Sequence, residues 1–293
     1  MSVTFEPPIA AGGMGGRIRR LTGQKSAQSP SAWRAARVTP LAEFYQWGRV
    51  GSALFMLVAR ASLTYWLWTA LYKGTATSAG MTVREATTYA MLGVFYQSFR
   101  VVNRWAARDT MVQHMLEGTI VYWFLRPVSP RRYYCIRTSG DLLYGGCWAA
   151  VAYTVALESG VIEPPASLAA GLAAGATLAL GLVILYYLQQ LIDLACFWTV
   201  VNFQLVIVYG ILQNVLAGAF VPLWFFPSWF ITIDQWLPFQ STLNVPLSLY
   251  IGRVPVSGLG GDLAIQAAWI CLLAIVLTFV WRRAAARVTV LGG

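Results

Sequence analysis

The chain has little of the chemistry that enzymes and metal sites use. Charged residues make up 11% of its 293 residues, and it has one histidine, His114. No His-Glu-x-x-His, Cys-x-x-Cys or Gly-x-Ser-x-Gly motif occurs, and the four cysteines fall singly in or beside apolar segments. We therefore expect no metal, no other cofactor and no nucleophile triad, and we interpret the cysteines as small core residues.

A phosphate-binding loop for ATP is also missing from the sequence. That loop ends in Gly-Lys-Ser or Gly-Lys-Thr, with a second glycine five residues earlier. Lys25-Ser26 supplies the last two residues of the motif, but Gln24 stands where the loop requires glycine. We therefore expect that this chain does not bind or hydrolyse ATP by itself.

What the chain has in abundance is apolar sequence, which makes up 58% of it. A bilayer core about 30 Å thick needs roughly 20 apolar residues per helix. The pattern predicts an all-α membrane protein with six transmembrane helices. The expected helices lie near Val50–Tyr72, Glu85–Val102, Tyr133–Leu157, Ala166–Phe197, Asn202–Val221 and Leu263–Val280.

The positive charge is placed as in a multi-pass membrane protein. On a soluble chain, the formal net charge of +10 would suggest nucleic acid. Here most Lys and Arg residues lie before the first apolar segment, between the second and third, and after the last, and the other loops hold only Lys73, Arg84 and Arg253. Cytoplasmic loops collect Lys and Arg, so both termini are expected in the cytoplasm. The excess also favours anionic lipids, and no nucleic-acid partner is expected.

Three stretches differ from the spanning segments. Residues 1–40 are basic and rich in Gly, Ser and Pro, which predicts a disordered tail before a transmembrane domain of residues 41–293. Residues 41–51 are amphipathic and predict a helix that lies flat in the membrane interface. Residues 222–255 hold five prolines and many aromatic residues. They are too broken for one spanning helix and predict short interfacial or re-entrant helices on the outer side.

Polar residues inside the spans are the usual place to look for function in a membrane protein. Arg137 and Asp141 are one helical turn apart and can pair, either structurally or functionally. Asn202 and Gln213 share a helix face, either as polar contacts between helices or as part of a substrate path. The intramembrane polar residues are Arg60, Arg137, Asp141, Asp193, Asn202 and Gln213.

Two ordered sets of short motifs carry a family resemblance. The first, between the second and third spans, is Glu117-Gly118 followed by Leu125-Arg126-Pro127. The second, which begins at the end of the fifth span, consists of Gly218, Pro222, Phe226-Pro227 and Pro238-Phe239. From about residue 41 to the end, their order resembles that of ABC-2-type permeases, the six-helix subunits of ABC exporters that lack their own ATPase domain.

The resemblance implies specific roles for these segments. The stretch near 41–51 would be an elbow helix, and residues 103–132 would hold a short cytoplasmic coupling helix that contacts an ATP-binding cassette subunit. The implied coupling residues are Arg104, Arg108, Asp109, His114, Glu117 and Gly118, and the loop closes with Leu125, Arg126 and Pro127. The implied outer gate consists of Gly218, Pro222, Phe226, Pro227, Pro238 and Phe239.

The sequence thus predicts a permease subunit of an ATP-driven exporter in the plasma membrane. The implied partners are two ATP-binding subunits and a second permease, in a homodimer or a heterodimer, and the expected substrate is amphiphilic or hydrophobic. Two alternatives remain open. An ion-driven secondary transporter would need intramembrane acids, for which Asp141 and Asp193 are the candidates. An integral membrane lipid enzyme would need clustered acids, histidines or a metal at one membrane face.

Overall fold

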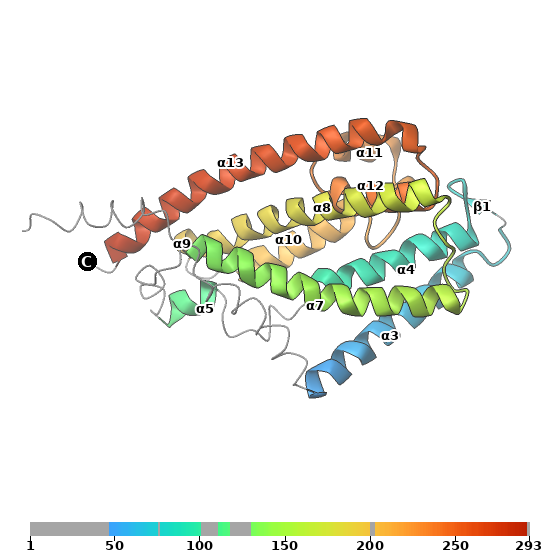
Figure 1. Cartoon of the computed structure of the whole chain (residues 1–293), viewed down its shortest axis with the longest axis horizontal. Coiled ribbons are helices and arrows are strands. Elements are labelled where there is room, and N and C mark those ends of the chain that lie inside the picture. Colours follow the sequence, from blue (N-terminus) through green and yellow to red (C-terminus); the bar gives the residue numbers. More distant parts are fainter. Residues whose placement is uncertain (1–46, 76, 101–110, 118–129, 200–202, 292–293) are drawn as a thin grey trace, which may run out of the picture.

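A computed structural model of the chain describes residues 47–75, 77–100, 111–117, 130–199 and 203–291. Within these residues, the longest helices form an elongated bundle (Figure 1). They coincide in position with the six predicted spans. Their bounds are α3 (Trp47–Leu71), α4 (Val83–Arg100), α7 (Pro130–Glu158), α8 (Leu168–Leu194), α10 (Phe203–Leu216) and α13 (Leu259–Leu291).

Successive long helices run in opposite directions, which gives the bundle two distinct ends (Figure 1). One end carries α5 (Met111–Leu116) and α9 (Cys196–Thr199), and we call it the α5 end. The other carries an antiparallel hairpin of β1 (Thr77–Ser78) and β2 (Met81–Thr82), and we call it the hairpin end.

The apolar helices confirm the predicted class of all-α membrane protein. Among the described residues, three helical stretches are long and apolar enough to cross a bilayer, namely Gly51–Leu71, Leu168–Thr199 and Val256–Arg287. Phe203–Leu216 is a shorter apolar helix. Since α4 and α7 carry more polar residues and fall outside this group, the number of six spans stays a prediction.

Helix α4 is the innermost helix of the bundle. Every residue from 86 to 96 is buried, because α3 and α7 pack along it. Helix α3 is the opposite case: only 6% of its most apolar 18-residue window is buried. Polar side chains such as Thr87 and Thr88 are therefore tolerated in α4, where protein surrounds them, whereas α3 is apolar on its exposed surface.

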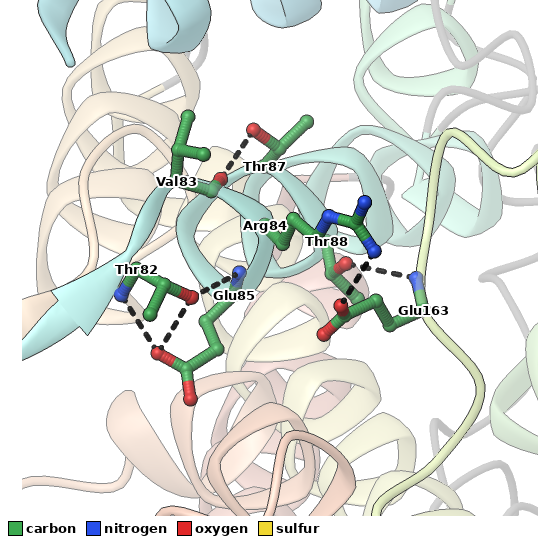
Figure 2. Close-up of polar contacts among 7 residues, drawn as sticks. All are labelled: Thr82, Val83, Arg84, Glu85, Thr87, Thr88 and Glu163. Carbon is green, nitrogen blue, oxygen red and sulfur yellow. Dashed lines mark hydrogen bonds and ion pairs between the residues drawn. The ribbon is translucent and has the colours of Figure 1, made fainter. Parts of the chain in front are cut away.

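The start of α4 is fixed by a capping box, which Figure 2 shows. The hydroxyl of Thr82 accepts a hydrogen bond from the Glu85 N–H at 3.3 Å, and the Thr82 N–H donates to the Glu85 carboxylate at 2.8 Å. The loop between α7 and α8 is attached to the same helix. There the Glu163 N–H donates to the Thr88 hydroxyl at 3.0 Å, and Arg84 lies 3.7 Å from the Glu163 carboxylate.

The segment between α10 and α13 is folded into short helices at the hairpin end. Its prolines account for this, because proline removes a backbone donor and ends a helix. The elements are η1 (Leu223–Phe225), α11 (Ser228–Asp234), η2 (Gln240–Thr242), α12 (Asn244–Tyr250) and η3 (Val256–Gly258). Of these, η2 and α12 pack against α8, which places irregular backbone inside the bundle.

Candidate functional site

A group of buried polar side chains holds η2 between α8, α10 and α13. The Gln213 amide donates to the Thr242 hydroxyl at 2.8 Å. The Gln266 amide donates to the carbonyl of Ser241 at 2.8 Å and to that of Thr177 at 2.9 Å. Both glutamines are fully buried, with 0% of the residue exposed. We call Thr177, Gln213, Ser241, Thr242 and Gln266 the η2 clamp.

The clamp depends on a close approach of two backbones at Gly181. A Cβ atom at this position would lie 2.8 Å from the Ser241 carbonyl oxygen and 2.9 Å from Cα of Thr242. Real Cβ atoms do not approach backbone so closely, so a larger residue would push η2 away from α8. Glycine is therefore required here by space alone.

A second buried contact joins α4 to the same segment. The Tyr89 hydroxyl donates to the Asn244 side-chain oxygen at 3.0 Å, and its ring meets Trp224 edge-on at 5.4 Å. Gly218 lies against the same hydroxyl: its φ of +73° is left-handed, and a Cβ there would lie 2.7 Å from the tyrosine oxygen. Both properties require glycine at this predicted gate position.

The other predicted gate residues shape the short helices. Pro222 and Pro227 are the N-cap residues of η1 and α11. Phe226 stacks on Phe230 with ring centroids 4.6 Å apart. Pro238 is buried, and the carbonyl of the following residue, Phe239, accepts a hydrogen bond from the Thr242 hydroxyl. The predicted gate residues thus lie in one segment, but only Phe239 touches the η2 clamp through an observed bond.

Asp234, at the end of α11, is a buried carboxylate that the sequence analysis missed. It is 1% exposed, and within the described structure neither carboxylate oxygen has a hydrogen-bond partner. Because burial disfavours the charged form, the pKa of Asp234 rises from 3.8 to about 7. In the sequence, the only sign of this buried acid is that it directly follows the apolar residues of α11.

Arg253 joins the β-hairpin to the same segment. Its guanidinium donates at 2.8 Å to the carbonyl of Ala79 and at 2.8 Å to that of Gly80. It also lies 4.8 Å from the centre of the Trp224 ring, a cation–π distance. The hairpin turn and the Pro-rich segment are therefore held together by one planar cation.

At the α5 end, the structure describes part of the predicted coupling segment. Met111 is buried in a cluster with Leu194 and Trp281, and Met115 packs against that cluster. His114 is half-buried and Glu117 is exposed. The remaining members of the two predicted sets lie outside the described residues: Arg104, Arg108, Asp109, Gly118, Leu125, Arg126 and Pro127.

The predicted elbow and the N-terminal tail are described only in part. Residues 1–46 lie outside the described structure. Residues 47–51 belong to α3, which continues without a break to Leu71. Of the short helix expected at 41–51, the structure therefore describes only residues 47–51, which form the first turn of α3.

The predicted intramembrane residues have different partners. Arg60 donates to the Gln97 side chain at 3.5 Å, and Asp193 accepts from Gln189 at 3.1 Å. The partner of Gln213 is Thr242 of the inserted segment, which agrees with polar contact between elements. The side chains of Arg137 and Asp141, and the whole of Asn202, lie outside the described residues.

The fold and the buried polar clamp define a multi-pass helical membrane protein with a folded-back segment at one end. A family model described as "ABC-2 family transporter protein" matches residues 58–292. The chain belongs to this family, as its motifs predicted, and it is therefore a membrane-spanning permease component of an ABC-type transporter. No curated protein matched the chain, and no solved structure matched it.

Replacing either clamp glutamine by leucine should destabilise the protein. Gln266→Leu removes the side-chain donor to two buried carbonyl groups, and Gln213→Leu removes the partner of a buried hydroxyl. An unsatisfied buried polar group costs about 1–3 kcal/mol, so the apparent unfolding temperature in detergent should fall by several degrees. The matched control is Gln235→Leu at an exposed position. Equal unfolding temperatures for all three variants would contradict the role of the clamp.

The stability of the wild type should depend on pH through Asp234. The folded protein retains a proton up to about pH 7, whereas the unfolded chain loses it near 3.8. The unfolding temperature should therefore fall as pH rises from about 4 to 7 and then level off. Asp234→Asn should remove this decline and be more stable than wild type at pH 8. Glu158→Gln, which changes an exposed acid at the same end, should leave the decline unchanged, and a decline that persists in Asp234→Asn would refute the assignment.

Proposed function

We propose that this chain is the permease subunit of an ATP-driven exporter in the plasma membrane. It crosses the bilayer six times, with both termini and the α5 end in the cytoplasm. Two copies of a separate ATP-binding subunit dock there, and a second permease, identical or different, completes the pathway. The observation that carries the proposal is the position of α5, a short helix packed across the basic end of an ABC-2 family bundle.

The distribution of charge supports this orientation. Among the residues whose side chains the structure describes, the α5 ends of α7 and α13 carry Arg131, Arg132, Arg282, Arg283 and Arg287. The hairpin end has Lys73, Arg84 and Arg253, together with the acids Glu85, Glu158 and Glu163. Because Lys and Arg concentrate on the cytoplasmic side of a membrane protein, the α5 end is assigned to the cytoplasm.

The packing of α5 supports a role in coupling. Its apolar side is anchored through Met111 to the ends of α8 and α13, so α5 moves with those helices. Helix α8 also contacts η2 at Gly181. At 1.5 Å per residue, Gly181 lies about 20 Å along the helix axis from Leu194, at the end that holds α5. ATP-driven closure of the partner subunits would push α5, tilt α8 as a rigid body and displace η2 and the predicted outer gate.

The exposed surfaces support a hydrophobic or amphiphilic substrate. Large apolar side chains of α3 and α10, including Phe55, Trp66 and Ile211, are exposed. These faces are available to the second permease, to lipid and to an apolar substrate that passes between the two subunits.

The orientation predicts which positions react from outside the cell. In a variant whose four cysteines are replaced by serine or alanine, Ser159→Cys at the hairpin end should react with a membrane-impermeant maleimide in intact cells. Glu117→Cys and Arg283→Cys at the α5 end should react only after the membrane is opened. The reverse pattern would invert the topology, and labelling of both ends from outside would contradict the placement of the two ends on opposite sides of the membrane.

Partner capture tests the coupling role. The chain should co-purify with an ATP-binding subunit from mild detergent, and Glu117→Arg and Arg108→Glu should lower its recovery at least tenfold. Lys73→Glu, a charge reversal at the exposed opposite end, is the matched control and should not change recovery. A chain that transports its substrate when every ATP-binding partner has been deleted would sink the proposal and favour an ion-driven carrier.

A further inference from the structure

A cavity of about 340 Å³ lies between α4, α7, α8 and α12. Its walls are apolar and include Leu92 and Phe95 of α4, Leu178 of α8 and Leu247 of α12. The volume falls within the range of about 300–1,000 Å³ that is typical of ligand pockets. Nothing in the proposed export pathway uses this cavity, because it lies within one subunit.

The cavity exists because the facing residues of α7 and α8 are small. In the described structure, α7 packs against α4 while α8 packs against α12 and α13, and α7 and α8 make little direct contact. Ala150 of α7 and Gly175 of α8 are exposed cavity residues, so the space opens sideways between these two helices. Val151, which follows Ala150 in α7, and Leu172, three residues before Gly175 in α8, are exposed apolar residues. A bilayer around the protein would therefore present its hydrocarbon directly to the opening.

Two tyrosine hydroxyls of the cavity wall are hydrogen-bonded within the protein. The Tyr250 hydroxyl donates to the Glu163 carbonyl at 3.0 Å. The Tyr153 hydroxyl lies 3.0 Å from the Tyr250 hydroxyl and therefore donates to its oxygen. Both tyrosine protons are thus used. A water molecule needs two to four polar partners to reside in a cavity, whereas most of this wall is apolar. An empty cavity loses the dispersion contacts that a hydrocarbon occupant restores.

A cation at the hairpin end is linked to the cavity wall through Glu163. Arg84 pairs with Glu163, whose backbone carbonyl accepts the Tyr250 hydroxyl at the cavity wall. The side chain of Arg84 is 80% exposed, so its remaining donors are free to meet a phosphate group (Figure 2). The site therefore combines an apolar cavity, a sideways entrance in the lipid-facing surface and a positive group at the hairpin end.

We propose that this cavity holds one acyl chain of a membrane phospholipid, which enters between α7 and α8 with its phosphate toward Arg84. The acyl chain would contact Leu247 of α12, so the bound lipid would support the Pro-rich segment at α12. The proposal requires only that the bundle is embedded in a bilayer, and it does not depend on the exported substrate.

Lipid retention tests the site directly. The full chain is reconstituted into bilayers containing phosphatidylglycerol with brominated acyl chains, washed extensively in mild detergent and analysed by native mass spectrometry. The wild type should retain one brominated lipid per chain. Gly175→Phe and Ala150→Phe fill the entrance and should retain at least tenfold less. The control is Gly210→Phe on α10, since a Cβ at Gly175 or Gly210 meets nothing within 4 Å, and it should retain lipid as the wild type does.

Several outcomes would overturn the proposal. These are the absence of retained lipid in the wild type, or equal retention in the wild type and both entrance variants. Retention of added brominated oleic acid but not of phosphatidylglycerol would exclude the phospholipid. All variants are first shown to be monodisperse by size exclusion. If the phenylalanine variants do not fold, Ala149→Leu, which adds less volume at a buried cavity residue, should still lower retention about threefold.

Discussion

The insertion of η2 beside α8 is the constraint on which the hairpin end depends. Irregular backbone at membrane depth is tolerated only where protein satisfies its polar groups. Gly181 allows the approach, and Gln213 and Gln266 satisfy the inserted segment from α10 and α13. The close approach and the side-chain donors depend on one another, because a close approach without donors would bury unpaired carbonyl groups. The elements that surround η2 therefore form one cooperative unit although they are distant in the sequence.

The positions of the long helices could be predicted from the sequence because apolar length is a local property. The expected spans near Val50–Tyr72 and Leu263–Val280 fall within or close to α3 and α13. The η2 clamp could not be predicted in the same way. Gln213 was singled out, but its partner Thr242 lies in a segment whose prolines show that it is broken and not how it folds back. Gln266, Tyr89 and Asp234 were missed because their roles depend entirely on that fold.

Helices α3 and α4 show why hydropathy identifies only some of the long helices. Hydropathy reports how well a helix tolerates lipid, and α3, with 6% of its most apolar window buried, needs a uniformly apolar surface. Helix α4 is enclosed by protein from residue 86 to 96. Thr88 accepts a hydrogen bond from the Glu163 N–H, and the Tyr89 hydroxyl donates to the Asn244 side chain. A low hydropathy in a central helix is therefore compatible with crossing a bilayer, because its neighbours replace the lipid.

Helix α8 connects the two ends of the bundle on physical grounds. Close-packed elements move as rigid bodies, because their cores resist continuous deformation. At one end, α8 shares Leu194 with the cluster that holds α5, and near its middle it meets η2 without any intervening side chain at Gly181. A small tilt at the α5 end must therefore displace η2 or break the clamp. On its other side α8 borders the apolar cavity. This side of the helix is therefore packed less tightly than the side that contacts η2. The motion of α8 is consequently resisted least toward α7. An acyl chain that occupied the cavity would limit how far α8 can tilt.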